Sequence, residues 1–149
     1  YGFTLDAAAS ADNALCKIFY TSKINGLAQQ PRNQVIWINP PFKKIKDWLS
    51  WAVQRSKDNK TVVLLLPASL ETHWFKDYAA RGDIFLLRPR LPYIHPDPKK
   101  RAKKAGPPGA SILVVFHSKG LKPISDKIEI TFKQIPDDVM AAIRKSIKE

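Results

Sequence analysis

The chain has 149 residues, a length typical of one domain, and it carries a formal net charge of +12. This charge favours a polyanionic partner, nucleic acid before membrane. No apolar run approaches the roughly 18–20 residues that span a bilayer, and no basic amphipathic helix with a broad apolar face stands out. The single cysteine, Cys16, excludes a disulfide framework. Since Cys16 has no second ligand at zinc spacing, we expect a buried, inert thiol in a reducing compartment and no metal site.

The hydrophobic pattern predicts strands that alternate with helices. In chain order, the expected elements are a strand over 3–5 ending at Asp6, a small-residue loop over 7–10, a helical turn over 11–17, an extended piece over 18–20, a turn at 25–26 and a strand over 35–38. They continue with a helix over about 44–57, a strand over 61–66, a helix over about 70–80, a strand over 84–87, a long loop over 89–109, a strand over 111–116, an edge strand over 127–132 and a helix from 136 to about 148.

This order of elements predicts a single α/β domain over residues 1–149. Strands joined by helices imply crossovers and a parallel sheet. The final strands lie close together in sequence without a clear helix between them, so we expect one antiparallel strand near the C-terminal end. The start of the chain enters almost directly into a strand and lacks the regions of a signal peptide, so we expect that upstream residues precede it.

The helix over 44–57 and the strand after it have the clearest patterns. Apolar residues recur at i, i+3, i+4, i+7 and i+8 from Ile45 to Val53, which is one face of a helix. The run from Thr61 to Leu66 is continuously apolar, as expected of a strand that is buried on both faces, and Pro67 stops it.

The most informative residues are Asn39-Pro40-Pro41-Phe42, which follow the apolar run 35–38. Two prolines end the strand abruptly, because proline cannot donate to a sheet ladder. The Asn and the Phe are therefore expected on a stiff loop at the carboxyl end of a strand, where ligands bind in open α/β sheets. The Asn39 amide oxygen and the Pro40 carbonyl can both accept from an NH2 group, and Phe42 can stack on a ring. Adenine fits this description, although Asn-Pro-Pro can also be only a turn.

Taken together, several segments in order resemble the phage-type DNA adenine-N6 methyltransferases, which use S-adenosylmethionine. The matching segments are 3–6 with the small residues and Asn13 after them, 20–27, 38–42, Trp48, 62–67, 72–75, Arg90 and 111–116. Order and spacing hold over roughly residues 2–117. The Asn-Pro-Pro-aromatic element alone also occurs in methyltransferases that act on glutamine side chains and on RNA, whereas the whole series is more specific.

The resemblance implies a Rossmann-like methyltransferase sheet with the cofactor over the carboxyl ends of its first strands. It implies that Asp6 pairs with the amino group of S-adenosylmethionine, and the alternative for Asp6 is a simple helix cap. The small residues Ala7, Ala8 and Ser10 would permit close approach, and Asn13 would help to hold the methionine end. The family also suggests a phage or prophage protein that acts in the bacterial cytoplasm.

The catalytic set expected from the motif is Asn39, Pro40, Pro41 and Phe42. Two acceptors on the adenine amine would favour a more nucleophilic nitrogen and stabilise the charge that develops on it. No strong general base is required, so the histidines at 73, 95 and 117 are expected in surface or packing roles. The adenine must be flipped out of a duplex, and stacking on Phe42 can recover about 1–3 kcal/mol of that cost.

The densest positive run lies in the long loop and predicts contacts with phosphates of double-stranded DNA. The residues expected to bind nucleic acid are Arg90, Lys99, Lys100, Arg101, Lys103 and Lys104. The alternative for this run is a solvated loop.

Two other functions remain open. A decayed, nucleic-acid-binding module is favoured by the missing upstream segment, by Pro89 where the family often has glycine, and by Asn25 where it often has an acid. Methylation of RNA or of a protein amide is the other, although the large positive charge disfavours a protein substrate. The intact Asn39 to Phe42 motif favours the adenine-N6 DNA methyltransferase.

Overall fold

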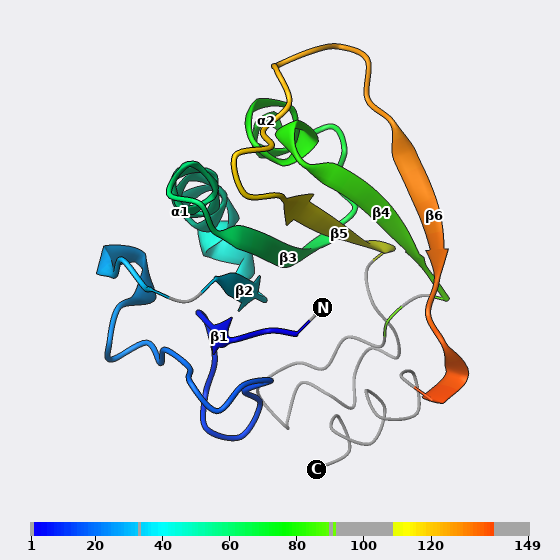
Figure 1. The fold of residues 1–149 in the computed structure, drawn as a ribbon. Coiled ribbons are helices and arrows are strands. Elements are labelled where there is room, and N and C mark those ends of the chain that lie inside the picture. The colour runs from blue at the N-terminus through cyan, green and yellow to red at the C-terminus, as the bar shows by residue number, and fades with distance from the viewer. Residues whose placement is uncertain (1, 33, 90, 92–108, 139–149) are drawn as a thin grey trace.

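A computed structural model describes residues 2–32, 34–89, 91 and 109–138. Its elements in chain order are β1 (Leu5–Asp6), η1 (Gly26–Ala28), β2 (Val35–Ile38), η2 (Phe42–Lys44), α1 (Ile45–Lys57), β3 (Thr61–Pro67), α2 (His73–Asp77), η3 (Ala79–Arg81), β4 (Asp83–Arg88), β5 (Ser111–Phe116) and β6 (Ile130–Gln134) (Figure 1). The strands form one sheet in the order β1-β2-β3-β5-β4-β6.

One strand of this sheet runs against the others. β1, β2 and β3 are mutually parallel, β4 is parallel to β6, and β5 is antiparallel to both of its neighbours. The expected mixed sheet with an antiparallel strand near the C-terminal end is therefore confirmed. One edge collects the carboxyl ends of β1, β2, β3, β4 and β6 together with the amino end of β5. We call it the carboxyl edge, and the opposite one the amino edge.

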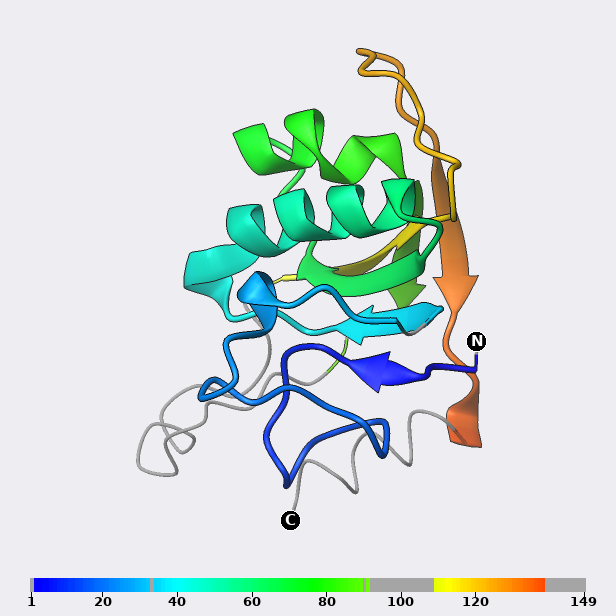
Figure 2. The ribbon, with the colours of Figure 1, turned by 60° about the vertical axis from the view of Figure 1, so that its left-hand side comes forward.

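α1 and α2 lie on the same face of the sheet, as two views of the ribbon show (Figure 1, Figure 2). α1 buries Trp48, Leu49 and Ala52 against that face, which confirms the helix expected from the apolar spacing. β3 lies inside the sheet, and Val62, Val63 and Leu64 have no exposed surface. The continuous apolar run therefore reports burial on both faces, as expected.

The helix expected over about 70–80 is interrupted. α2 begins at His73 because the Thr72 side chain accepts from the Phe75 N–H and caps it. Tyr78 then leaves helical geometry, with φ −125° and ψ −61°, and a separate short 3-10 turn follows. The tertiary fold thus breaks one amphipathic pattern into two short pieces.

The N-terminal segment differs from expectation in its details. The first strand is Leu5–Asp6, so it includes the aspartate that was expected to end it. Residues 11–17 form turns and no helix, and the Asp6 side chain accepts from the Leu15 N–H, which a helix would direct to a backbone carbonyl. The extended piece over 18–20 is confirmed, since Phe19 forms a parallel bridge with Asp6.

The expected edge strand over 127–132 begins and ends later, as β6, where Ile130 aligns with Ile84 of β4. Most of the expected loop over 89–109 and most of the helix from 136 to about 148 lie outside the described residues.

Candidate functional site

The Asn-Pro-Pro-Phe segment lies at the carboxyl edge, immediately after β2. Asn39 is exposed and Pro40 is buried. Pro41 has φ −61° and ψ 140°, which is extended geometry. η2 begins at the next residue, and α1 follows η2 directly. Two rings in succession therefore turn the chain from a strand into a helix within a short distance and leave the Asn39 side chain facing solvent.

Two acceptors of this segment have no partner among the described residues. The Pro41 carbonyl is engaged, because it accepts from the Lys44 N–H at 2.9 Å. Within the described part of the chain, no hydrogen bond involves the Asn39 side chain or the Pro40 carbonyl. Phe42 follows them with 52% of its surface exposed. The segment thus offers an amide, a carbonyl oxygen and an aromatic face, as expected from its sequence.

Asp6 lies at the same edge on the neighbouring strand, since its register partner on β2 is Trp37. Its side chain is 2% exposed and accepts from the Leu15 N–H at 3.0 Å and from the Ala8 N–H at 3.4 Å. Burial raises the pKa of this carboxyl, while the two backbone hydrogen bonds act in the opposite direction. In this structure, Asp6 anchors the loop that follows it.

The loop after β1 is tied down by further backbone contacts. Ala7 N–H donates to the Trp37 carbonyl at 2.9 Å, and Ala9 N–H donates to the Tyr20 carbonyl at 3.0 Å. Ser10 N–H donates to the Asn13 side chain at 2.8 Å, which closes a local turn. Ala7 is buried and Ala8 partly buried, whereas Ser10 and Asn13 are exposed at the outer part of the loop.

Gly26 packs against the loop that follows β1, a contact that the sequence does not reveal. A Cβ at Gly26 would lie 2.6 Å from the Ala7 carbonyl oxygen and 2.7 Å from the Trp48 ring. Only glycine allows η1 to approach both groups so closely. The sequence signal at this position was the Asn25-Gly26 turn, which says nothing about the contact with Ala7.

The structure therefore brings the expected cofactor-binding and catalytic residues to one edge of the sheet. The expected nucleic-acid-binding residues, Arg90, Lys99, Lys100, Arg101, Lys103 and Lys104, lie outside the described residues. The described residues that flank them, Pro89 and Gly109, follow β4 and precede β5 at this same edge.

Two of the three histidines can be placed. His73 is exposed at the start of α2, and His117 lies at the amino edge with Nε2 2.7 Å from Asp83 Oδ2. Neither belongs to the segment around Asn39, and His95 lies outside the described residues.

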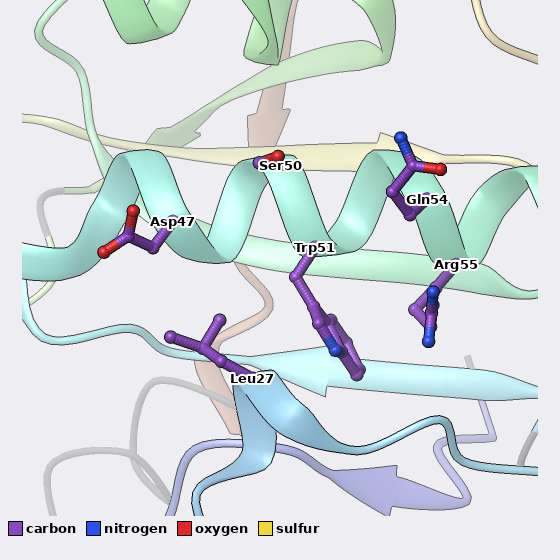
Figure 3. Close-up of a pocket in the computed structure, with 6 residues that line it drawn as sticks. All are labelled: Leu27, Asp47, Ser50, Trp51, Gln54 and Arg55. Carbon is purple, nitrogen blue, oxygen red and sulfur yellow. The ribbon is translucent and has the colours of Figure 1, made fainter.

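Two hollows of the described surface lie away from Asn39. One hollow of about 290 Å³ lies along α1 beside Leu27 and includes Trp51 and Arg55 (Figure 3). A second hollow of about 460 Å³ lies at the amino ends of β2 and β3, and Arg55 also lines it. We assign the candidate site to the carboxyl edge, because the residues expected to bind the cofactor and the base lie together there and ligands of α/β sheets bind at that edge.

Two kinds of feature are absent from the described residues. No group of three or more His, Cys, Asp or Glu side chains there has the arrangement of a metal site. No helix among them is long and apolar enough to cross a membrane.

Comparison with known proteins gives consistent similarities. The model of the family described as DNA N-6-adenine-methyltransferase (Dam) matches residues 1–140. A protein of Haemophilus phage HP1 named DNA N-6-adenine-methyltransferase is 30% identical over 121 residues, which is 78% of this chain and 68% of that protein. A protein of Escherichia phage T1 with the same name is 35% identical over 79 residues, 52% of this chain, so the matching part spans only 33% of that relative's length.

Proposed function

Because this chain belongs to the DNA N-6-adenine-methyltransferase (Dam) family, we propose that it transfers a methyl group from S-adenosylmethionine to the N6 amine of adenine in DNA. The observation that carries the proposal is the pair of unpartnered acceptors, the Asn39 amide and the Pro40 carbonyl, at the carboxyl edge. The parallel strands β1, β2 and β3, with α1 in the crossover from β2 to β3, support a Rossmann-like methyltransferase fold.

The two acceptors account for the chemistry at the amine. The N6 nitrogen of adenine is a weak nucleophile because its lone pair is delocalised into the ring. Hydrogen bonds from its two hydrogens to Asn39 and Pro40 would favour a pyramidal nitrogen and stabilise the positive charge that develops on it. The stiff Pro40-Pro41 loop supplies the positioning, which contributes a large part of the barrier reduction.

The loop after β1 is suited to hold the cofactor, whose sulfonium supplies the methyl group. The small side chains of Ala7 and Ala8 keep the backbone accessible to a close neighbour, and Ser10 and Asn13 are exposed for polar contacts. Asp6 holds this loop through Leu15 and Ala8. Its direct contact with the cofactor's amino group remains a prediction.

The target adenine must leave the duplex to reach Asn39. Flipping costs a few kcal/mol, and stacking on the exposed ring of Phe42 would return about 1–3 kcal/mol. Aromatic stacking tolerates any base, so the acceptors at Asn39 and Pro40 would select bases that carry an exocyclic amine, as adenine does.

Duplex DNA is the proposed partner, in the cytoplasm of a bacterial host, because the named relatives are phage proteins. The basic run over 99–104 would supply phosphate contacts. Neutralising its five cations should weaken binding to all DNA sequences about equally, and each lost contact should flatten the slope of log affinity against log salt by about 0.9.

One experiment tests the proposal. The protein is incubated with S-adenosylmethionine carrying a labelled methyl group and with duplex DNA, single-stranded DNA or RNA, and the products are digested to nucleosides. We expect label in N6-methyldeoxyadenosine from duplex DNA. Label only in RNA, or DNA binding without any transfer, would overturn the proposal and favour an RNA methyltransferase or a decayed binding module.

A further inference from the structure

The second hollow lies at the amino edge, away from Asn39, and nothing above gives it a role. It has a volume of about 460 Å³, and its lining includes three cations, Arg32, Arg55 and Lys60, with two glutamines, a proline and a single carboxylate, Asp58. Such a lining holds an excess of positive charge and several hydrogen-bond donors, which suits an oxygen-rich anion.

Arg55 lines both this hollow and the one shown in Figure 3, and several contacts hold its side chain in place. Its side chain is 11% exposed, and its guanidinium carbon lies 5.5 Å from the centre of the Trp51 ring. One terminal nitrogen donates to the Gln29 carbonyl at 3.4 Å, and the other lies 3.1 Å from Asp58 Oδ2. The one carboxylate of the lining, Asp58, is therefore already paired with Arg55.

This pairing leaves the charges of Arg32 and Lys60 uncompensated. Among the described residues, the one partner of Lys60 Nζ is the main-chain carbonyl of Asp58, at 3.3 Å. Arg32 is exposed and makes no ion pair within the described part of the chain. The two cations thus line a hollow without an anion of their own.

The position of the hollow is fixed by the sheet. Gln34 immediately precedes β2 and Lys60 immediately precedes β3, and the Gln34 carbonyl accepts from the Thr61 N–H at 2.8 Å. Asn39 lies beyond the other end of β2, five residues after Gln34 and thus about 17 Å from it at about 3.3 Å per residue. That separation equals about five base-pair steps of a DNA strand, at about 3.4 Å each.

We propose that this hollow is a phosphate-binding site, in which Arg32 and Lys60 contact the phosphate and Arg55 forms the floor. Its occupant is a backbone phosphate of the DNA flanking the target adenine, a source that rests on the function proposed above. A free phosphate or a nucleotide phosphate presents the same chemistry and is separated from DNA by the test.

The test compares two double variants of the full chain. Arg32→Gln with Lys60→Gln removes the two uncompensated cations. Lys57→Gln with Lys127→Gln removes the same charge from two exposed lysines that do not line the hollow. Equal melting temperatures of the two variants would establish that both fold.

The first readout is the salt dependence of binding to a duplex. The first variant should flatten the slope of log affinity against log salt by about 1.8, which is two contacts at about 0.9 each, and the control variant should leave the slope unchanged. The second readout is the shift of backbone amide NMR signals around residues 30–34 and 58–60 on addition of inorganic phosphate at constant ionic strength. These shifts should appear in the wild-type protein and vanish in the first variant.

The outcomes separate cleanly. A slope change confined to the first variant supports the site with DNA as its occupant. Phosphate shifts lost without a slope change support the site but assign it to a free or nucleotide phosphate. Equal slope changes in both variants with no phosphate shifts would overturn the site. Failure to methylate DNA would refute the proposed function alone, since the inorganic phosphate readout needs no DNA.

Discussion

The two edges of the sheet differ in whether their polar groups have hydrogen-bond or ion-pair partners. At the carboxyl edge, Asn39 and the Pro40 carbonyl lack partners in the described structure, and Asp6 is buried with a raised pKa. At the amino edge, Asp83 lies 2.7 Å from both Lys122 Nζ and His117 Nε2. The hydrogen bond from Lys122, partly opposed by burial and assisted by His117, lowers the pKa of Asp83.

This difference separates groups that serve the fold from groups that serve a ligand. Satisfied charges at the amino edge need nothing further. The carboxyl edge is where ligands of α/β sheets bind, and its exposed Asn39 amide is accessible to one. The cations around the amino-edge hollow are the exception, which is why a phosphate is proposed there.

The largest expected effect is the loss of turnover in Asn39→Ala. Removing one preorganised group that stabilises developing charge costs about 10²–10³ in kcat. The matched control is Gln134→Ala, which removes an exposed amide at the end of another parallel strand. Turnover would be measured on duplex DNA, with calorimetry to show that cofactor binding is retained. Normal turnover in Asn39→Ala would refute its assigned role.

A smaller effect is expected for Phe42→Ala, since it removes the stacking surface for the flipped base. Binding to DNA should weaken by about 1–3 kcal/mol. Phe132→Ala is the control, because it removes another exposed ring, which lies on β6 under Arg88 and outside the Asn-Pro-Pro-Phe segment. Equal losses in both variants would mean that general apolar contact, rather than the carboxyl edge, is responsible.

Two glycines, one packed at each edge of the sheet, allow the edges to be compared through the free energy of unfolding. A Cβ at Gly26 would press on Ala7 and Trp48 at 2.6 and 2.7 Å, and one at Gly82 would press on the Val115 carbonyl at 2.7 Å. Each change to alanine should cost about 1–3 kcal/mol of unfolding free energy. Only Gly26→Ala should also weaken cofactor binding, as calorimetry would show. Gly2→Ala is the neutral control, since nothing lies within 4 Å of its Cβ.

The smallest expected effect is an opposite pH dependence of the two aspartates. The folded pKa of Asp83 is lowered, so its contribution is present above the unfolded value near 3.9 and is lost as pH falls through the folded pKa. The folded pKa of Asp6 is raised, so its contribution is present below that unfolded value and is lost as pH rises through the folded pKa.

Denaturant unfolding of Asp6→Asn and Asp83→Asn between pH 3 and pH 7 would measure both. With rising pH, the wild-type protein should gain stability relative to Asp83→Asn and lose stability relative to Asp6→Asn. The Asp83 effect should be modest, because that side chain is 36% exposed and solvent screens its pairs. Curves of the same sign would contradict the contrast between the edges.

Several elements could be predicted because their cause is local. The period of α1 reports one buried face, and the apolar run of β3 reports two. The stiff loop at Asn39 follows from two prolines after a strand, whatever the rest of the chain does. The break between α2 and η3 could not be predicted, since a helical pattern persists through Tyr78 while its backbone leaves helical geometry.

By itself, the sequence determined the succession of strands and helices, the acceptors of the Asn-Pro-Pro-Phe segment and the excess of positive charge. Only the tertiary structure decided that β5 lies between β3 and β4. It also decided that the Asp6 carboxylate accepts from the Leu15 N–H and that Gly26 lies against Ala7. It also gathered Arg32, Arg55 and Lys60 around one hollow. The physical reason is range: turn chemistry and periodic burial act between near neighbours in the chain, whereas these contacts join residues that only the packed sheet brings together.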